Sequence, residues 1–111
     1  MAQVIWTRRA LIHLRGIVDD SAVRFSPARS EKLRARILAA GDLLARFPLI
    51  GSVAPEFNRE HLRERYVKPF RVLYVVRGDV CAVVGVFHAS RDLSAIDPEE
   101  VERLPNGFNG P

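Results

Sequence analysis

The sequence predicts an α+β domain of two layers, in which a helical hairpin packs on a small, mainly antiparallel sheet. Three observations lead to this fold class. Apolar residues recur at helical spacing through residues 8–46, nearly continuous apolar runs follow at 72–76 and 80–86, and a polar triplet, Arg77-Gly78-Asp79, separates those runs. The predicted order of elements is β-α-α-β-β-β, followed by a short helix.

The first half of the chain contains one short strand and the two helices. Residues 3–6 are a strand candidate, and Thr7 is a suitable N-cap for a helix over about residues 8–24. The run Asp19-Asp20-Ser21 leaves open whether that helix is continuous. Ser26-Pro27 predicts the start of a second helix that reaches about Arg46.

The second half contains the sheet. Residues 49–58 include Gly51 and Pro55 and have no clear period, so a connecting loop is expected there. Strands are predicted at about 62–67, 70–76 and 80–88, and alternation places Arg63 and Arg65 on one face of the first of them and Glu64 on the other. Asp97-Pro98 predicts a final helix that ends near residue 104.

Length and charge indicate one domain with an acidic extension. The chain of 111 residues suits a single domain, which we place at 1–93, with residues 94–111 as the extension. Residues 1–91 carry 16 basic and 8 acidic residues, a net charge of +8. Residues 92–111 carry 1 basic and 5 acidic residues, a net charge of −4. The basic body favours an acidic or polyanionic partner.

Several functional classes are disfavoured. No apolar run reaches the ~20 residues of a membrane span, and the N-terminus has no signal pattern, so a cytoplasmic protein without membrane contact is expected. Cys81 is the only cysteine and sits in an apolar strand, which predicts a buried, inert thiol. His13, His61 and His88 are too scattered for a metal motif. No glycine-rich phosphate loop is present, so no cofactor is expected.

The motifs together resemble the RelE/ParE superfamily of bacterial type II toxins, over about residues 4–93. The resemblance is closest to the ParE-like branch, whose members share an H-x-x-R-D ending with His88–Asp92. The other matching motifs are Trp6-Thr7 followed by Ala10 and Leu14, Phe47-Pro48 with Gly51, Arg63-Glu64, and Phe70-Arg71-Val72-Leu73-Tyr74.

The resemblance implies a growth-inhibiting toxin of the bacterial cytoplasm. A cognate acidic antitoxin would neutralise it and could form a toxin–antitoxin hetero-oligomer with it, and such modules contribute to plasmid stabilisation. ParE-like members inhibit DNA gyrase, whereas RelE-like members are ribosome-dependent endonucleases that cut messenger RNA. Neither activity requires a cofactor, and the shared fold does not choose between them.

The residues favour the gyrase inhibitor, with the ribonuclease as the alternative. RNA cleavage needs a proton acceptor, cations around the phosphate and an acid for the leaving oxygen. Arg71, His88, Arg65 and Arg91 are the candidates for these roles. Arginine is a poor general base, and no tyrosine follows His88, so the catalytic set is partial. His88 is alternatively a packed residue at a strand end.

Two cationic surfaces are predicted for binding. Arg63, Arg65, Arg71 and Arg91 lie near strand ends and are expected to form a rigid basic platform for the target; alternatively, Arg71 pairs with Glu64 or Asp79 across the sheet. Arg29, Lys32 and Arg36 on the second helix are expected to receive the antitoxin, or else to form a solvated face. The acidic extension is predicted to fold back over the platform and neutralise part of it.

Overall fold

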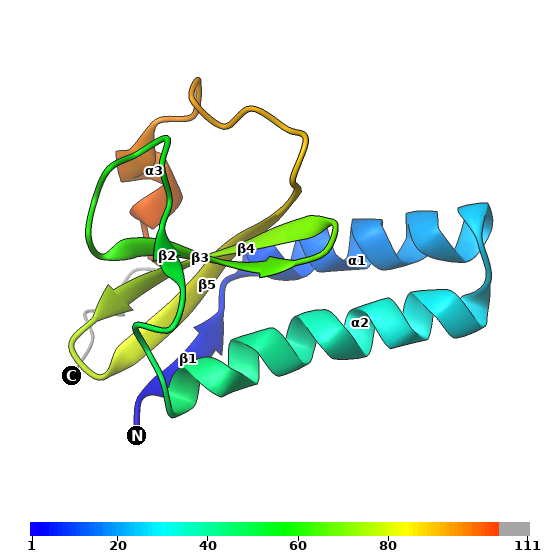
Figure 1. Cartoon of the computed structure of the whole chain (residues 1–111), viewed down its shortest axis with the longest axis horizontal. Coiled ribbons are helices and arrows are strands. Elements are labelled where there is room, and N and C mark those ends of the chain that lie inside the picture. Colours follow the sequence, from blue (N-terminus) through cyan, green and yellow to red (C-terminus); the bar gives the residue numbers. More distant parts are fainter. Residues whose placement is uncertain (105–111) are drawn as a thin grey trace.

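Two long helices cover one face of a five-stranded sheet, in the computed structural model of residues 1–104 (Figure 1). The predicted α+β fold class is therefore confirmed. Residues 105–111, which belong to the predicted acidic extension, lie outside the described part of the chain. The elements are β1 Gln3–Trp6, α1 Arg8–Arg24, α2 Pro27–Asp42, a 3₁₀ turn η1 Leu43–Ala45, β2 Ser52–Val53, β3 Leu62–Val67, β4 Phe70–Arg77, β5 Val80–His88 and α3 Pro98–Glu102.

The helices begin at the predicted caps. Thr7 Oγ1 accepts a hydrogen bond from Ala10 N at 3.2 Å, and Ser26 Oγ accepts one from Arg29 N at 3.1 Å. α1 is continuous through the run of two acids and a serine, because Ser21 is buried and Asp20 pairs along the helix with Arg24 at 3.0 Å. The predicted end of the second helix near residue 46 corresponds to α2 followed by η1.

The sheet has the order β1-β5-β4-β3-β2. β1 pairs in parallel with β5 at one edge, and the other pairs are antiparallel. Gly78, with φ of 55°, occupies the first position of the two-residue turn between β4 and β5, where a positive φ favours glycine. The loop prediction for residues 49–58 was wrong at Ser52 and Val53, which pair with β3; two residues are too few to leave a period in the sequence.

Apolar residues are buried on both faces of the sheet. On the helical face, Ala10, Leu14 and Ile37 pack against strand residues that include Val72 and Tyr74. Trp6 also packs there, over Gly41, where a Cβ would lie 2.6 Å from the indole ring. On the second face, the cluster contains residues of the strands and of the C-terminal segment: Leu62, Leu73, Val75, Ala82, Val84, Phe87, Leu93, Val101 and Leu104.

The C-terminal segment therefore packs on the sheet opposite the helical hairpin (Figure 1). Asp97 Oδ1 accepts a hydrogen bond from Glu99 N at 3.0 Å and caps α3. The helix ends at Glu102, two residues before the predicted end.

Candidate binding groove and the predicted cationic residues

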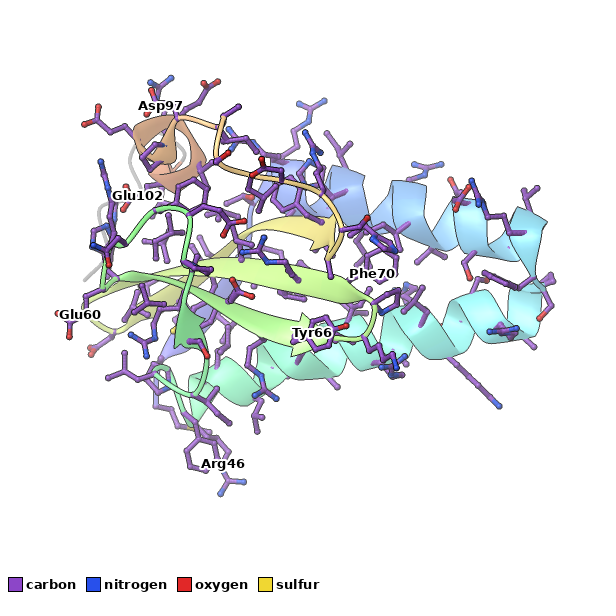
Figure 2. The ribbon with its side chains drawn as sticks, turned by 45° about the horizontal axis from the view of Figure 1, so that its top comes forward. Arg46, Glu60, Tyr66, Phe70, Asp97 and Glu102 are labelled. Atoms are coloured by element: carbon purple, nitrogen blue, oxygen red, sulfur yellow. The ribbon has the colours of Figure 1, made fainter. Side chains whose placement is uncertain are left out.

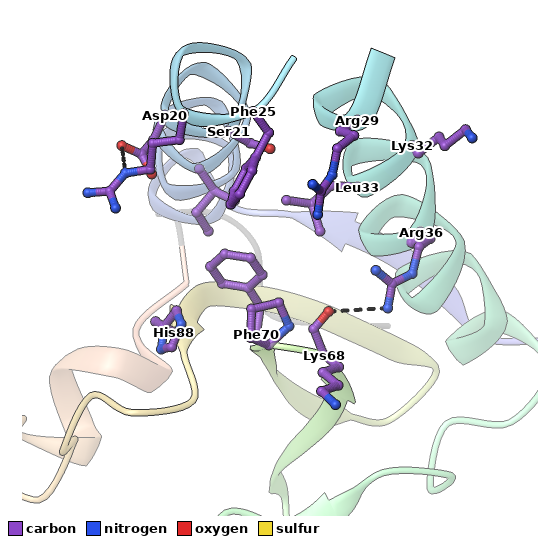
Figure 3. Close-up of a pocket in the computed structure, with 13 residues that line it drawn as sticks. Asp20, Ser21, Phe25, Arg29, Lys32, Leu33, Arg36, Lys68, Phe70 and His88 are labelled. Carbon is purple, nitrogen blue, oxygen red and sulfur yellow. Dashed lines mark hydrogen bonds and ion pairs between the residues drawn. The ribbon is translucent and has the colours of Figure 1, made fainter. Parts of the chain in front are cut away.

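A groove of about 530 Å³ opens between the outer ends of α1 and α2 and the β3–β4 turn. Figure 3 shows Phe25, Leu33 and Phe70 directed toward one another across it. The complete lining is Ile17, Asp20, Ser21, Arg24, Phe25, Arg29, Lys32, Leu33, Arg36, Lys68, Pro69, Phe70 and His88.

The groove exists because the helices extend beyond the sheet. α1 starts just after β1 ends beside Val83, and its 17 residues span about 25 Å. β5 continues from Val83 only to His88, which is about 17 Å of strand. The outer turns of the helical hairpin therefore have no strand beneath them (Figure 1). Apolar side chains stay accessible there, and Phe25 is 60% exposed.

The rim of the groove is basic. Asp20 neutralises Arg24 at 3.0 Å, whereas the Arg29 guanidinium lies 4.3 Å from the centre of the Phe25 ring. Lys32 and Lys68 form no ion pair within residues 1–104. The rim thus carries more positive than negative charge around an apolar floor, which suits an acidic, amphipathic ligand.

The three residues predicted to receive an antitoxin all line this groove. Arg29, Lys32 and Arg36 are separated by three and four positions, so they lie on one face of α2. Arg36 Nη2 donates to the main-chain oxygen of Lys68 at 3.2 Å and so joins α2 to the β3–β4 turn. The apolar floor of the groove was not predicted, because Phe25 and Phe70 are far apart in the sequence and meet only in the folded chain.

His88 lies at the same groove, at the end of β5. Its Nδ1 accepts a hydrogen bond from Ser90 N at 3.1 Å and is 2.7 Å from Ser90 Oγ. The ring packs edge-on against Phe70, with 5.5 Å between ring centres. As the acceptor, Nδ1 is unprotonated, so Nε2 carries the proton of the neutral ring.

Arg71 is buried between two carboxylates on the second face of the sheet. Its Nη1 and Nη2 donate to Glu56 at 2.6 Å each, and its Nε and Nη2 donate to Glu64 at 3.2 and 2.6 Å. Its side chain is 9% exposed. The hydrogen bonds from Arg71 hold the pKa of Glu56 below its ordinary value, although burial opposes this shift.

The expectation of one basic platform is therefore wrong. Arg71 is opposite Tyr66 in the register of β3 and β4, and alternation puts it on the face of Glu64. Arg63 and Arg65 point to the helical face. Of the two predicted partners of Arg71, the structure has Glu64, and it adds Glu56.

The other predicted target-binding arginines are held separately. Arg63 donates to three main-chain oxygens, those of Gly51 at 3.0 Å, Glu60 at 3.0 Å and Leu49 at 3.4 Å. Arg65 is half-buried, and its Nε has no partner within the described residues. Arg91 is exposed, with its guanidinium 5.2 Å from the centre of the Phe87 ring. The four groups form no common array.

The acidic C-terminal segment does fold back, but onto other cations. Glu102 is 4% exposed; its carboxylate accepts from Arg59 Nη1 at 2.6 Å and contacts His61 Nε2. Figure 2 shows Glu102 and Asp97 on α3, at a distance from Phe70. The segment was predicted to shield Arg63, Arg65, Arg71 and Arg91. This prediction is wrong for its buried acid, Glu102, which binds Arg59 and His61 because α3 lies over the β2–β3 loop.

His13 has a structural role that the sequence did not reveal. β1 pairs with β5 only as far as Val83, and beyond it the main-chain N of Val86 donates to His13 Nδ1 at 3.2 Å. Burial, with the nearby Arg9 and Arg91, lowers the pKa of His13. The neutral imidazole thereby accepts a hydrogen bond from a β5 main-chain N–H that the short β1 does not reach.

Cys81 is buried, as predicted, and burial raises the pKa of its thiol. No three His, Cys, Asp or Glu side chains converge in the described part of the chain as a metal site would require. None of the helices within residues 1–104 has the length and apolar character needed to cross a lipid bilayer.

The fold and the groove define a small α+β domain with a basic rim around an apolar floor. Residues 4–93 match the model of the ParE toxins of type II toxin–antitoxin systems, parDE, so the chain belongs to this family. It is 36% identical over 91 residues to Toxin RelE2 of Caulobacter vibrioides, a match that covers 82% of this chain and 99% of that protein. The solved chromosomal ParDE TA system from P. aeruginosa is similar in fold, with a TM-score of 0.70, 22% identity, and coverage of 81% of this chain and 98% of that chain.

Proposed function

We propose that this toxin inhibits DNA gyrase by binding to it, as the ParE-like branch implies, in the bacterial cytoplasm. The observation that favours binding over RNA cleavage is the dispersal of the candidate catalytic residues. Arg65 and Arg71 lie on opposite faces of the sheet, and two carboxylates neutralise Arg71. Cleavage requires a base, an acid and cations that converge on one phosphate.

The second candidate is a RelE-like ribonuclease. It is supported by the relative named Toxin RelE2 and by His88, an exposed imidazole at a basic groove and thus a residue type that serves as a general acid or base. Its weakness is the surroundings of His88, since Arg71 is bound elsewhere and Arg91 packs on Phe87.

One pair of assays separates the two activities. Purified toxin with gyrase and supercoiled plasmid should accumulate cleaved DNA, whereas translating ribosomes exposed to the toxin should show no new cuts in the messenger RNA. Cuts in the ribosomal A site that disappear in His88→Ala, with intact plasmid in the gyrase assay, would replace the first proposal by the second.

We further propose that an acidic antitoxin binds the groove, with Arg29, Lys32 and Arg36 facing its carboxylates. The apolar floor and the excess of positive charge on the rim support this assignment, and the ParDE structure concerns a toxin–antitoxin system. The antitoxin would contribute apolar side chains between Phe25 and Phe70 and acids toward the rim.

Charge reversal tests this assignment. Lys32→Glu puts a negative charge on the rim and should weaken antitoxin affinity by about tenfold or more. Arg34→Glu is the matched control, since Arg34 lies on the same helix, pairs with Glu31 at 3.3 Å and is absent from the groove lining. Equal affinities of the two variants, measured by calorimetry, would place the antitoxin elsewhere.

Among the four arginines first assigned to the target, Arg91 remains the candidate contact because its side chain is exposed. Arg91→Ala should reduce gyrase inhibition without changing antitoxin affinity. An unchanged concentration for half-maximal plasmid cleavage would remove Arg91 from the target surface.

A further inference from the structure

The segment after Leu93 extends beyond the part of the chain that the family model matches, which ends at that residue. The curated relative is covered over 99% of its length by 91 residues of alignment. Residues 94–104 are thus an addition to the part shared with the family, and they carry Asp97, three glutamates and one arginine.

This added segment has an apolar seat on the second face of the sheet. Leu93 is 0% exposed, Val101 2% and Leu104 9%, and all three belong to the cluster that contains Leu62 and Leu73. By contrast, Ser94, Ala95 and Asp97 between these anchors are exposed. The segment therefore contacts the sheet through separate apolar anchors and an exposed connection.

The segment also has a carboxylate anchor. Glu102 lies between Arg59 and His61, and its main-chain oxygen accepts from Arg77 Nη2 at 3.2 Å. These groups come from the β2–β3 loop and from β4, and none belongs to the segment itself. Arg59 and His61 thus bind one carboxylate at the edge of an apolar face, and Arg77 binds the main chain of the same residue.

α3 is too short to be a stable helix by itself, since its five residues are far fewer than an isolated helix needs in water. Its conformation therefore depends on the seat. Short length, acidic charge, apolar anchors and one buried carboxylate are the features of a peptide ligand that folds on its receptor.

We propose that the second face of the sheet is a docking site for a short acidic amphipathic segment, occupied in this chain by residues 93–104. The strap, as we name these residues, shields the face in the free protein, and a partner's segment of the same chemistry binds there when the strap is displaced. While the strap occupies the second face, an acidic partner can bind only in the groove between the helices and the sheet. Displacement of the strap makes the second face accessible as well.

The test uses the complete chain with one substitution in the strap. Glu102→Ala removes the carboxylate anchor, and Glu99→Ala is the matched control because Glu99 is an exposed acid on the same helix. In the Glu102 variant, amide hydrogen exchange of residues 93–104 should accelerate by about tenfold or more, with α1 and α2 unchanged. The control should exchange as the parent chain does.

Docking is measured with a fluorescent peptide of the sequence LSAIDPEEVERL, residues 93–104. Its affinity for the Glu102→Ala chain should exceed its affinity for the parent and the Glu99→Ala chain by about tenfold or more, because a tethered strap competes at an effective concentration near millimolar. A second peptide with alanine at the Glu102 position should bind about tenfold more weakly than the first.

Two outcomes would overturn the proposal. One is faster exchange of the strap with no gain in peptide affinity; the other is faster exchange throughout the chain, since the segment would then be an inseparable part of the core. If Glu102→Ala does not fold, Glu102→Gln serves instead, because it removes the charge of the anchor within the strap and leaves Arg59 and His61 of the seat unchanged. Since neither readout involves gyrase or an antitoxin, a negative result leaves the proposed function intact.

Discussion

Removal of the Arg71 side chain tests whether the buried ion cluster on the second face stabilises the fold. Arg71→Met retains much of the apolar stem but leaves Glu56 and Glu64 near each other, with side chains that are 16% and 17% exposed. Loss of one partner from a buried pair costs about 3–5 kcal/mol. For a chain of this size the melting temperature should fall by about 12–20 °C.

The pH dependence identifies the cause of this loss. In the parent chain the pKa of Glu56 is lower in the folded state than in the unfolded state. Ionised Glu56 therefore contributes its full stabilisation above the unfolded pKa, and this stabilisation is lost as the pH falls through the folded pKa. Without Arg71, burial and repulsion from Glu64 should raise the pKa of Glu56 above its unfolded value. The ionised Glu56 then becomes unfavourable as the pH rises, so the variant should regain stability on acidification toward pH 4.5.

Urea denaturation at several pH values measures both effects. The triple variant Glu56→Gln, Glu64→Gln, Arg71→Met is the control, since it removes every charge and should recover most of the lost stability. A loss below about 1 kcal/mol at pH 7, or a loss that does not change between pH 4.5 and 7.5, would refute the reasoning.

Four further substitutions have defined expectations. The pKa of His13 is lower in the folded chain than in the unfolded chain, so on acidification the unfolded chain binds the proton first and the free energy of unfolding should fall below about pH 6.5. His13→Asn keeps a hydrogen-bond acceptor but does not titrate. It should therefore reduce the dependence of the melting temperature on pH, as measured in thermal melts. Gly51→Ala should lower the free energy of unfolding by about 1–3 kcal/mol, because the added Cβ would lie 2.4 Å from Glu64 O and 2.8 Å from the Tyr74 hydroxyl. In the same denaturation experiment, Gly16→Ala should stabilise α1 by about 0.5–1 kcal/mol, because its Cβ would have no atom within 4 Å. His88→Ala should change plasmid cleavage by gyrase by less than about twofold, and a loss of more than tenfold would instead make His88 part of the gyrase-binding surface.

The elements that the sequence predicted best are those whose signals are local. A cap, a proline and an apolar period lie within one segment, so α1, α2 and the strands β3, β4 and β5 were found close to their observed bounds. β2 was missed because its strand character comes from pairing with Arg63 and Glu64, not from its own two residues.

The site residues depended on contacts between distant segments. Alternation alone was enough to put Glu64 on the opposite face from Arg63 and Arg65, and the register then adds Arg71 to the face of Glu64. Glu56 comes from a loop without a period, and Glu102 comes from the far end of the chain, so neither partner was visible before the fold was known. Arg29, Lys32 and Arg36 were grouped correctly because helical spacing is itself local.

Because the helices extend past the sheet, the hydrophobic core is accessible to solvent at one end. A ligand in that opening would act as the missing layer, so its binding energy would add directly to folding stability. The unbound toxin should accordingly open first at the tip of its helical hairpin, and recognition of the partner and completion of the fold become one process.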